Sequence, residues 1–288
     1  MIYYINKHFQ ERILKLILSL SLFCFVFFAK GQTDTIYISY SNEVKEFFSL
    51  ATSKALSQGI LTKELKRKQP ATIKFNSLIA NARIRLKGDW TDHIKKDKWS
   101  FRVELERGNL YYVRKFSLQF PETRGGENES VFHEVLISEG ILTTDYRFVH
   151  LVVNDKYWGV FAFEEHFDEL LIENNKRIGG PILKFDEEGF WECQMMTKIQ
   201  GENKCYEYPI FDAARVKVFN KKKILKDSVS QILFLKSRSI LEQWQRGEVN
   251  KENIDLDKFA RYYALCDVFQ FYHGLQWHNQ RFYYRTIN

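Results

Sequence analysis

The sequence predicts an α+β fold, in which an antiparallel sheet is followed by a mostly helical half. Short segments of alternating apolar and polar residues follow one another from 71 to 120, which is typical of antiparallel strands with one wet face. Beyond residue 222, apolar residues recur at helical spacing instead. Strands and helices do not alternate regularly along the chain, so a repeating βαβ architecture is excluded.

The composition places the chain among ordinary globular proteins. The 288 residues are 45% apolar and 16% aromatic, and 43 Lys and Arg stand against 36 Asp and Glu, a formal charge of +7. These fractions exclude a disordered or collagen-like chain, and the length allows one large domain or two small ones. Part of the positive charge lies in the first 31 residues, so the remaining surplus is too small to predict nucleic-acid binding.

The N-terminal segment has the pattern of a targeting signal. Basic residues precede the fourteen-residue apolar run 16–29, which is shorter than the roughly 20 residues that a membrane-spanning helix needs. Ala29 and Gly31 then place small residues at alternate positions, as at a signal-peptidase site. We predict that residues 1–31 are a secretory signal peptide and that the secreted, extracytoplasmic protein starts at Gln32. An uncleaved anchor is the alternative, and no later segment is apolar enough to span a membrane.

Export would leave three cysteines in an oxidising compartment, enough for one disulfide and one free thiol. Cys193 and Cys205 flank a polar insert and could close a small loop, but the spacing leaves their pairing open. Cys266 lies in an apolar run, where a buried, inert thiol is expected. No CxxC motif or His/Cys array predicts a zinc site.

The first part of the chain is predicted to be a helix followed by strands. Residues 32–70 form an N-terminal extension with a helix over 41–68, and Pro70 marks its end. The turn-forming pairs Gly88-Asp89 and Gly108-Asn109 then separate segments in which apolar and polar residues alternate. The expected strands are 71–75, 82–87, 100–105 and 115–118.

The rest of the chain mixes helices with a few strands. Asn154 and Asp155 predict a tight turn between two strands, and Gly140 ends the helix before them. Residues 187–212 show no periodicity and are expected to be irregular. The expected helices are 130–139, 167–174, 222–246 and 255–273, and the expected strands are 146–153, 159–163, 181–185 and 281–284.

The densest polar segment lies near the C-terminus. Asp267 ends a helix, His273, His278 and Asn279 follow in a loop, and an aromatic strand comes next. In phosphotransfer sites an Asp orients the attacking hydroxyl, and an Asn in the same loop holds a metal ion that bridges phosphate oxygens. A helix-ending Asp with a capping Asn and aromatic packing is the structural alternative.

A second candidate group lies on the strands. Arg85, Lys87 and Lys98 could contact nucleotide phosphates, or they could form a solvated strand face. Glu134 on an apolar helix could pair with a strand lysine, or it could lie exposed. Glu164, at the start of Glu-Glu-His, could belong to a hinge whose backbone meets an adenine edge, or could precede a helix. Walker, GxSxG and HExxH motifs are absent from the sequence.

In this order, these segments resemble the CotH kinase family, which is named for a spore-coat protein and related to atypical secretory-pathway kinases. The resemblance covers about 80–288, and its most specific part is the strand-turn-strand that ends at Glu164-Glu165. The matching segments are 83–89, 98–105, 148–149 and 153–165, followed by Asp267, His273, Asn279 and 282–284.

The resemblance implies an atypical kinase-like fold, with an antiparallel-sheet N-lobe over 71–186 and a partial helical C-lobe over 187–288. It also implies ATP, a divalent metal (Mg²⁺ or Mn²⁺), and phosphorylation of Ser on exported proteins. The resemblance also implies a role for each candidate residue. Lys98 is the first choice for the lysine that contacts phosphate and Lys87 the second, and Glu134 would pair with that lysine. Asp267 would have the catalytic-loop role, Asn279 would be a metal ligand, and His278 could orient either Asp267 or Asn279.

The sequence departs from the family pattern at one point. In the family an acidic, often DxD-like, metal motif follows the aromatic strand, whereas no Asp or Glu follows Asp267 here. Phosphoryl transfer depends on metal ions to neutralise charge, so we expect activity to need sequence beyond residue 288. The chain would then be a fragment or a truncated product. An inactive pseudokinase that acts in surface assembly and a structural or adhesive surface protein are the alternatives.

Overall fold

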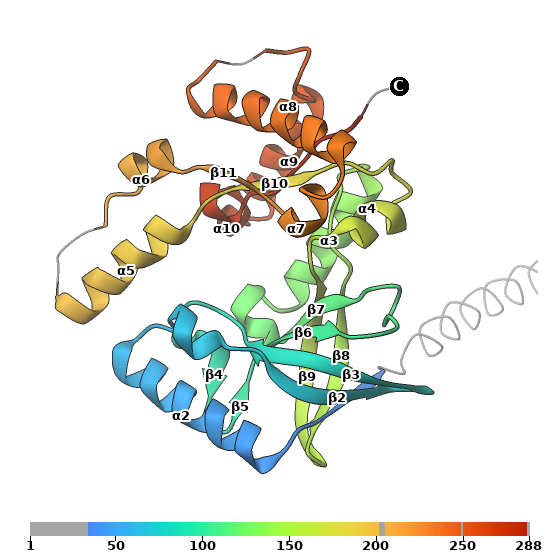
Figure 1. Cartoon of the computed structure of the whole chain (residues 1–288), viewed down its shortest axis with the longest axis vertical. Coiled ribbons are helices and arrows are strands. Elements are labelled where there is room, and N and C mark those ends of the chain that lie inside the picture. Colours follow the sequence, from blue (N-terminus) through green and yellow to red (C-terminus); the bar gives the residue numbers. More distant parts are fainter. Residues whose placement is uncertain (1–33, 202–204, 249, 287–288) are drawn as a thin grey trace, which may run out of the picture.

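The computed structural model describes residues 34–201, 205–248 and 250–286 and has a mixed α+β fold (Figure 1). A closed barrel forms one half, and helices around a small sheet form the other. The expected signal segment, residues 1–31, lies outside the described residues. Among the helices that are described, none combines the length and the apolar character needed to cross a bilayer.

Seven strands close the barrel. Neighbouring strands are antiparallel except for the first and last, which pair in parallel and close the ring. Apolar residues alternate inward along the strands, as the period-two pattern predicted. In spatial order the strands are β1 (Thr35–Ser39), β2 (Gln69–Phe75), β3 (Leu78–Leu86), β6 (Phe101–Leu105), β7 (Lys115–Gln119), β9 (Lys156–Glu165) and β8 (Tyr146–Val153).

Local turns fix the register of the barrel. Asn154 and Asp155 have φ angles of 46° and 63°, so both central residues of the β8–β9 hairpin are left-handed, as a tight two-residue turn requires. This turn was predicted from the sequence. A short hairpin, β4 (Ile94–Lys95) with β5 (Lys98–Trp99), lies between β3 and β6.

The N-terminal segment belongs to the barrel and is not a separate helical extension. β1 pairs with both β2 and β8, and helix α2 (Asn42–Gln58) buries Phe48 completely against the barrel core. Ser41 caps the start of α2, and Gly59, at φ 72°, ends it, so the helix stops ten residues before the expected end at 68. A 3₁₀ turn, η1 (Lys63–Lys66), follows.

The second half is built on a three-stranded antiparallel sheet. Its central strand is β10 (Ile182–Phe185), flanked by β11 (Val216–Val218) and β12 (Phe282–Tyr283). The final aromatic strand therefore has a partner. The helices around the sheet are α5 (Glu188–Gln200), α6 (Glu207–Ala213), α7 (Lys221–Ile224), α8 (Ser228–Gln245), α9 (Leu256–Val268) and α10 (Tyr272–Leu275).

Two of these helices correct the expectation that 187–212 is irregular. α5 and α6 occupy that range and extend away from the sheet (Figure 1). A disulfide joins Cys193 on α5 to Cys205 just before α6, which resolves the pairing that the sequence left open. Cys266 is buried and free, as predicted.

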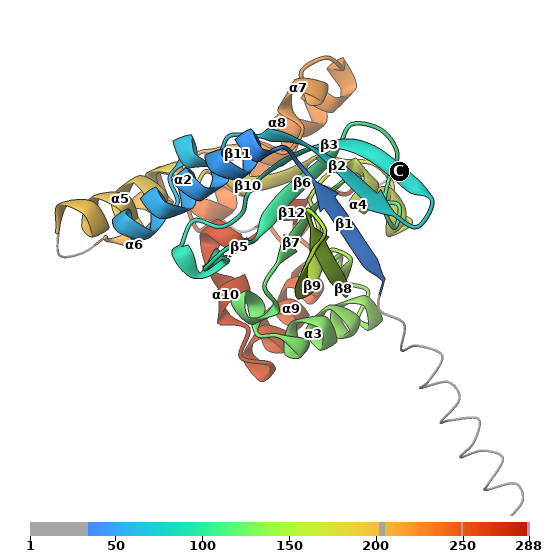
Figure 2. The same ribbon diagram turned by 90° about the horizontal axis from the view of Figure 1, so that it is seen from below.

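Helix α3 (Glu127–Ser138) connects the two halves. It packs on β8 of the barrel, and its Phe132 and Leu136 join a cluster with Cys266, Phe269 and Phe271 of the helical half. Figure 2 shows α3 beside β8, β9 and α9 from below. The 3₁₀ turn η3 (Pro121–Arg124) leads into α3, and α4 (Glu169–Asn174) follows β9 on the other side. The remaining 3₁₀ turns are η2 (Thr91–His93) and η4 (Trp277–Asn279).

Candidate active site

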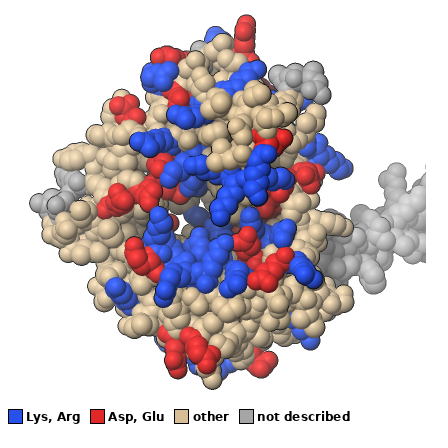
Figure 3. Space-filling view, viewed as in Figure 1, with Lys and Arg blue, Asp and Glu red and all other residues tan. Residues whose placement is uncertain are grey.

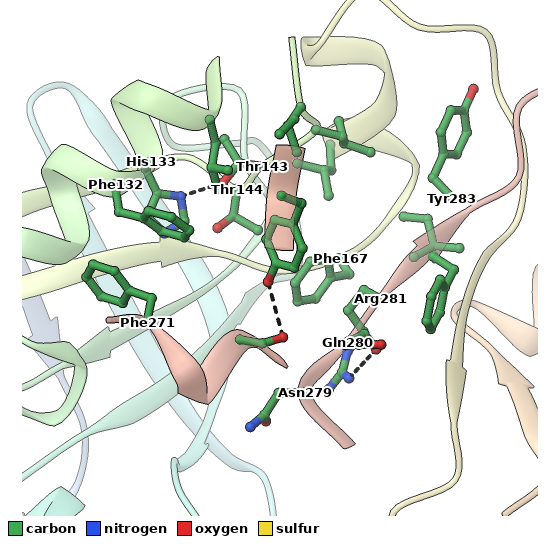
Figure 4. Close-up of a pocket in the computed structure, with 18 of the residues that line it drawn as sticks. Phe132, His133, Thr143, Thr144, Phe167, Phe271, Asn279, Gln280, Arg281 and Tyr283 are labelled. Atoms are coloured by element: carbon green, nitrogen blue, oxygen red, sulfur yellow. Dashed lines mark hydrogen bonds between the residues drawn. The ribbon is translucent and has the colours of Figure 1, made fainter. Parts of the chain in front are cut away.

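A cavity of about 460 Å³ lies where the barrel meets the helical half. Part of its wall is apolar, with Phe132, Phe167 and Phe271 among the residues shown in Figure 4. The rest is strongly basic. We use the term cation cluster for the four basic residues around the partly buried carboxylate Glu164, which are Lys87, Arg102, Arg124 and Arg281. Figure 3 shows Lys and Arg gathered at the hollow between the two halves.

A buried ion pair forms the centre of the cation cluster. Lys87 directly follows β3, and its Nζ donates to Glu164 Oε2 on β9 at 2.5 Å. Lys87 also donates to Gln119 Oε1 on β7, and Gln119 Nε2 donates to the same Glu164 oxygen at 3.0 Å. Each of the three side chains, Lys87, Gln119 and Glu164, is therefore hydrogen-bonded to the other two. Lys87 is only 6% exposed, so this geometry is fixed inside the protein.

The charges of this pair are set by its neighbours. Burial alone would raise the pKa of Glu164, but Lys87 and Arg124 outweigh burial and hold its pKa well below the usual range. Burial lowers the pKa of Lys87 to about 7, although Glu164 opposes this shift. Since Glu164 stays ionised among four basic side chains, the pocket has a surplus of positive charge at neutral pH.

Two arginines of the cation cluster have donors left over. Among the described residues, no hydrogen-bond partner reaches the buried Nε atoms of Arg102 and Arg281. Arg281 donates through NH1 to the carbonyls of His278 and Gln280 and lies 3.7 Å from Glu187. Buried donors are normally satisfied, and charged ones most of all. The two Nε atoms have almost no accessible surface, but both side chains line the cavity, so an anion there would meet their other guanidinium nitrogens.

Two histidines hold the guanidinium groups in place. The NH1 of Arg102 lies against Nδ1 of His166, and the NH1 of Arg124 lies against Nε2 of His273. Burial and Arg102 lower the pKa of His166 well below its usual value, and burial and Arg124 lower that of His273 to about 4. Both imidazoles are therefore neutral and can accept from the arginines without adding a charge.

Of the phosphate-contacting candidates, the structure places Lys87 at the pocket and Lys98 outside it. Lys98 lies on β5 and donates to the carbonyl of Trp158 at 2.7 Å. Arg85 lies beside the pocket, where it is the cross-strand partner of Arg102 and donates to the carbonyl of Leu86. Lys98 and Asp267, which the family resemblance assigned to one nucleotide site, are both absent from the lining of this cavity.

Glu134 is on the outer, exposed face of α3 and does not reach Lys87. The expected ion pair exists, but its carboxylate is Glu164 of β9. The acidic residue that α3 turns toward the pocket is Glu129, which shares a face with His133 one helical turn later. Glu129 and Glu134 are five positions apart on a helix with 3.6 residues per turn, so their side chains leave α3 in different directions.

Asp267 and His278 also lie outside the lining of the cavity. Asp267 is exposed in the last turn of α9, where Tyr272 OH donates to it at 3.3 Å. His278 is buried, and its ring stacks on Phe190 with centroids 4.3 Å apart. The structure gives His278 a place in the core of the helical half.

Asn279 does line the cavity. Its Nδ2 donates to the carbonyl of His273 at 3.1 Å and to Gln276 Oε1 at 3.3 Å, so Oδ1 is the atom available to a ligand. Within the described ranges no three His, Cys, Asp or Glu side chains form a metal-binding group. Since Mg²⁺ commonly takes one or two protein ligands plus phosphate oxygens, the pocket fits a metal that arrives with a phosphate ligand rather than a resident ion.

The backbone of Glu164-Glu165-His166 is already occupied. The N–H of Glu165 donates to the carbonyl of Asp145, and that of His166 donates to the carbonyl of Lys115. These donors complete the barrel and do not face a ligand. Of this segment, the Glu164 side chain is the part that reaches the pocket.

Sequence reasoning missed several residues of the site. Arg124 and Arg281 belong to the cation cluster, and Gln119 bridges its central ion pair. Arg124 directly precedes Gly125-Gly126, and Arg281 comes shortly after His278-Asn279. Their closeness to these segments is the sequence feature that could have identified them. Gln119 is the last residue of β7, and nothing in the sequence marks it as a site residue.

A comparison with protein-family models gives a match that covers most of the pocket. The model described as CotH kinase protein matches residues 84–286, which is more than half of the chain. No curated protein matches the sequence.

Proposed function

The chain belongs to the CotH kinase family, and from this premise we propose that it binds ATP in the pocket and transfers the terminal phosphate to Ser residues of exported proteins. The observation that carries the proposal is the cation cluster around Glu164. A triphosphate needs several cationic donors, and this pocket offers a lysine point charge and three guanidinium forks.

The pocket also has a place for the rest of the nucleotide. Its apolar wall includes Phe132, Leu171 and Phe271, which suit the flat face of a base. The cavity of about 460 Å³ is in the range of small-molecule sites. A polar end and an apolar end in one cavity match a ligand with a charged tail and an aromatic head.

We propose that the two halves correspond to the lobes of a kinase. The position of the cavity between a strand-rich half and a helical half supports this assignment. In it, the barrel supplies Lys87 and Glu164, and the helical half supplies Arg281 and Asn279. An extracytoplasmic location is part of the same proposal and rests on the signal-like pattern of residues 1–31. Exported proteins as substrates or surface partners rest on the family resemblance.

A divalent cation, Mg²⁺ or Mn²⁺, would neutralise phosphate charge when bound with the nucleotide. Asn279 Oδ1 is the ligand that this chain offers in the pocket. Lys87 and the arginines hold the phosphate oxygens, and Gln119 keeps Lys87 in position. Asp267 would orient the acceptor hydroxyl, a role that rests on the family resemblance.

The nucleotide site is tested by a matched pair of lysine variants. ATP with Mg²⁺ should raise the melting temperature of the wild-type protein, and Lys87→Met should weaken ATP binding by about tenfold or more in calorimetry, since a central cation is lost. Lys98→Met removes a lysine that lies outside the cavity and should bind ATP like wild type. Equal losses in both variants, or no response of the wild-type protein, would overturn the site.

Phosphate transfer is tested at Asp267. Asp267→Asn should abolish transfer of labelled phosphate to exported proteins and leave ATP binding unchanged, because Asp267 does not line the cavity. Undiminished transfer by this variant would refute its catalytic role.

A nucleotide-binding pseudokinase in surface assembly is the second candidate. The thin set of metal ligands among the described residues favours it. ATP binding by the wild-type protein, with no transfer to any exported protein, is the result that would support it.

A further inference from the structure

A hydroxyl, an imidazole and a carboxylate that do not belong to the cation cluster are aligned on the wall of the same pocket. Thr143 Oγ1 lies 2.5 Å from Nδ1 of His133, and Nε2 of His133 lies 3.5 Å from Oε1 of Glu129. All three residues line the cavity, and Figure 4 shows His133 directed at Thr143. Glu129 and His133 are one turn apart on α3, while Thr143 is in the segment that leads into β8.

One proton arrangement satisfies both contacts. Thr143 donates its hydroxyl proton to Nδ1, and Nε2–H of His133 points toward the Glu129 carboxylate. This order of groups is the one that activates a hydroxyl nucleophile in many enzymes, because the imidazole takes the proton and the carboxylate stabilises the resulting cation.

This array is continuous with the cation cluster. The ring of Tyr146 stacks on His133 with centroids 5.0 Å apart and an interplanar angle of 9°. Tyr146 is also the cross-strand partner of Glu164, which holds Lys87. The hydroxyl and the anion-binding groups therefore line one cavity, and Tyr146 is adjacent to both His133 and Glu164.

We propose that Thr143 is an activated nucleophile that accepts a phosphoryl group inside the pocket, with His133 as its base and Glu129 orienting the imidazole. The acceptor role rests on the proposed nucleotide site, whereas the nucleophile itself does not. The product would be a phosphothreonine whose negative charge faces the cation cluster.

The step balances without a further reactant. Thr143 Oγ1 forms a bond to the terminal phosphorus of the nucleoside triphosphate, and the bond from that phosphorus to the bridging β-oxygen breaks. The hydroxyl proton moves to Nδ1 of His133, and the nucleoside diphosphate leaves with the bridging oxygen. The proton then passes from the imidazole to solvent.

The nucleophile is tested without any nucleotide, by a fluorophosphonate probe. Such a probe reacts with an activated hydroxyl by forming an oxygen–phosphorus bond and releasing fluoride, and peptide mapping of the full chain locates it. We expect the label on Thr143. Thr143→Val should remove the label, and Thr143→Ser should retain it. His133→Gln should slow labelling by about a hundredfold, which is the effect expected for the loss of one acid–base group.

Thr144 supplies the matched control. It is the next residue, lines the same cavity and is also buried, but among the described contacts its hydroxyl has no bond to a histidine. Thr144→Val should label like wild type. Equal loss in Thr143→Val and Thr144→Val, or a wild-type protein that binds ATP but takes no label at Thr143, would overturn the nucleophile and leave Thr143 as a structural partner of His133.

The acceptor role is tested with ATP and Mg²⁺, by mapping phosphate on the full chain. Phosphate at Thr143, lost in Thr143→Val and kept in Thr144→Val, supports it. Bound ATP with phosphate on other residues alone overturns it. Probe labelling of Thr143 in a protein that shows no thermal response to ATP supports the nucleophile and overturns the nucleotide site, so the two failures are distinguishable.

Discussion

The barrel and the helical half bury their apolar residues in different ways. In the barrel, one continuous cluster extends from Ile36 to Phe163, and closure gives every strand a partner on both sides. The helical half is packed by smaller clusters, such as the one in which the partly buried ring of Trp244 packs against buried Leu183 and Phe185. The pocket lies between the two, so its groups come from one rigid wall and one less tightly packed wall.

The largest predicted effect is on the core of the barrel. Phe101 is fully buried and packs its ring on Phe48, Trp99 and Trp158. Phe101→Ala should lower the free energy of unfolding by about 3–5 kcal/mol, as loss of a buried aromatic ring does. Denaturant unfolding measures the loss.

The matching variant in the other half is Leu241→Ala on α8. Leu241 is 7% exposed in the smaller cluster, so its loss should be at the lower end of the range for such a change, about 2 kcal/mol. If Leu241→Ala costs as much as Phe101→Ala, the two halves share one equally tight core and the comparison is wrong.

The central ion pair should give the next largest effect. Glu164→Gln leaves the buried Lys87 without its carboxylate, at a cost of about 3 kcal/mol, the lower end for a broken buried pair, because Lys87 can release its proton. The double variant Lys87→Met/Glu164→Gln should recover part of the loss in a double-mutant cycle. Additive losses would show that the two side chains do not depend on each other.

The barrel could be predicted in detail because its signals are local. Alternation along 71–120 gives strands, and Asn154-Asp155 gives their turn, without knowledge of the rest of the chain. β1 was missed because a five-residue strand close to the apolar run 16–29 has little pattern of its own. α5 was missed because its Trp, Met and Gln residues form no apolar stripe.

The site was only partly predictable, since it depends on which strands become neighbours. Lys87 and Glu164 are 77 residues apart, and the closed barrel brings them together. The sequence alone could not rank Lys98 below Lys87, because both follow similar patterns and the fold of the β4–β5 hairpin decides which one faces the pocket. Arg281 was missed because only the folded chain brings the segment before β12 next to the barrel residues of the pocket.

Glu164 and Glu165 are neighbours on β9 that point to opposite faces and have opposite pKa shifts. Burial raises the pKa of Glu165 from 4.5 to about 7, with Asp145 and Asp168 adding to it, although the N–H of Asp145 donates to its carboxylate. The folded protein therefore binds the proton of the Glu165 carboxyl group more tightly than the unfolded chain does. The stability that this protonation contributes is present below pH 4.5 and is lost as the pH rises from about 4.5 to 7.

Glu165→Gln isolates this effect, because Gln cannot titrate. Relative to wild type, the variant should gain up to about 3 kcal/mol of unfolding free energy between pH 4.5 and 7.5, since one pKa unit is about 1.4 kcal/mol. Denaturant unfolding at several pH values measures the difference, in which the histidine contributions cancel. A difference that does not change with pH would show that Glu165 is ionised in the folded barrel.

The smallest global effect is expected from the disulfide, which closes a loop in the less tightly packed half. Cys193→Ser/Cys205→Ser removes a link for which loop entropy alone suggests about 3 kcal/mol. Met196 and Ile199, farther along α5, are exposed, so we expect this segment to open by itself. Hydrogen exchange should then show lost protection in α5 and α6, while the free energy of barrel unfolding changes by less than about 1 kcal/mol. A full 3 kcal/mol loss for the barrel would instead mean that α5, α6 and the barrel unfold as one unit, and that the helical half does not open separately from the barrel.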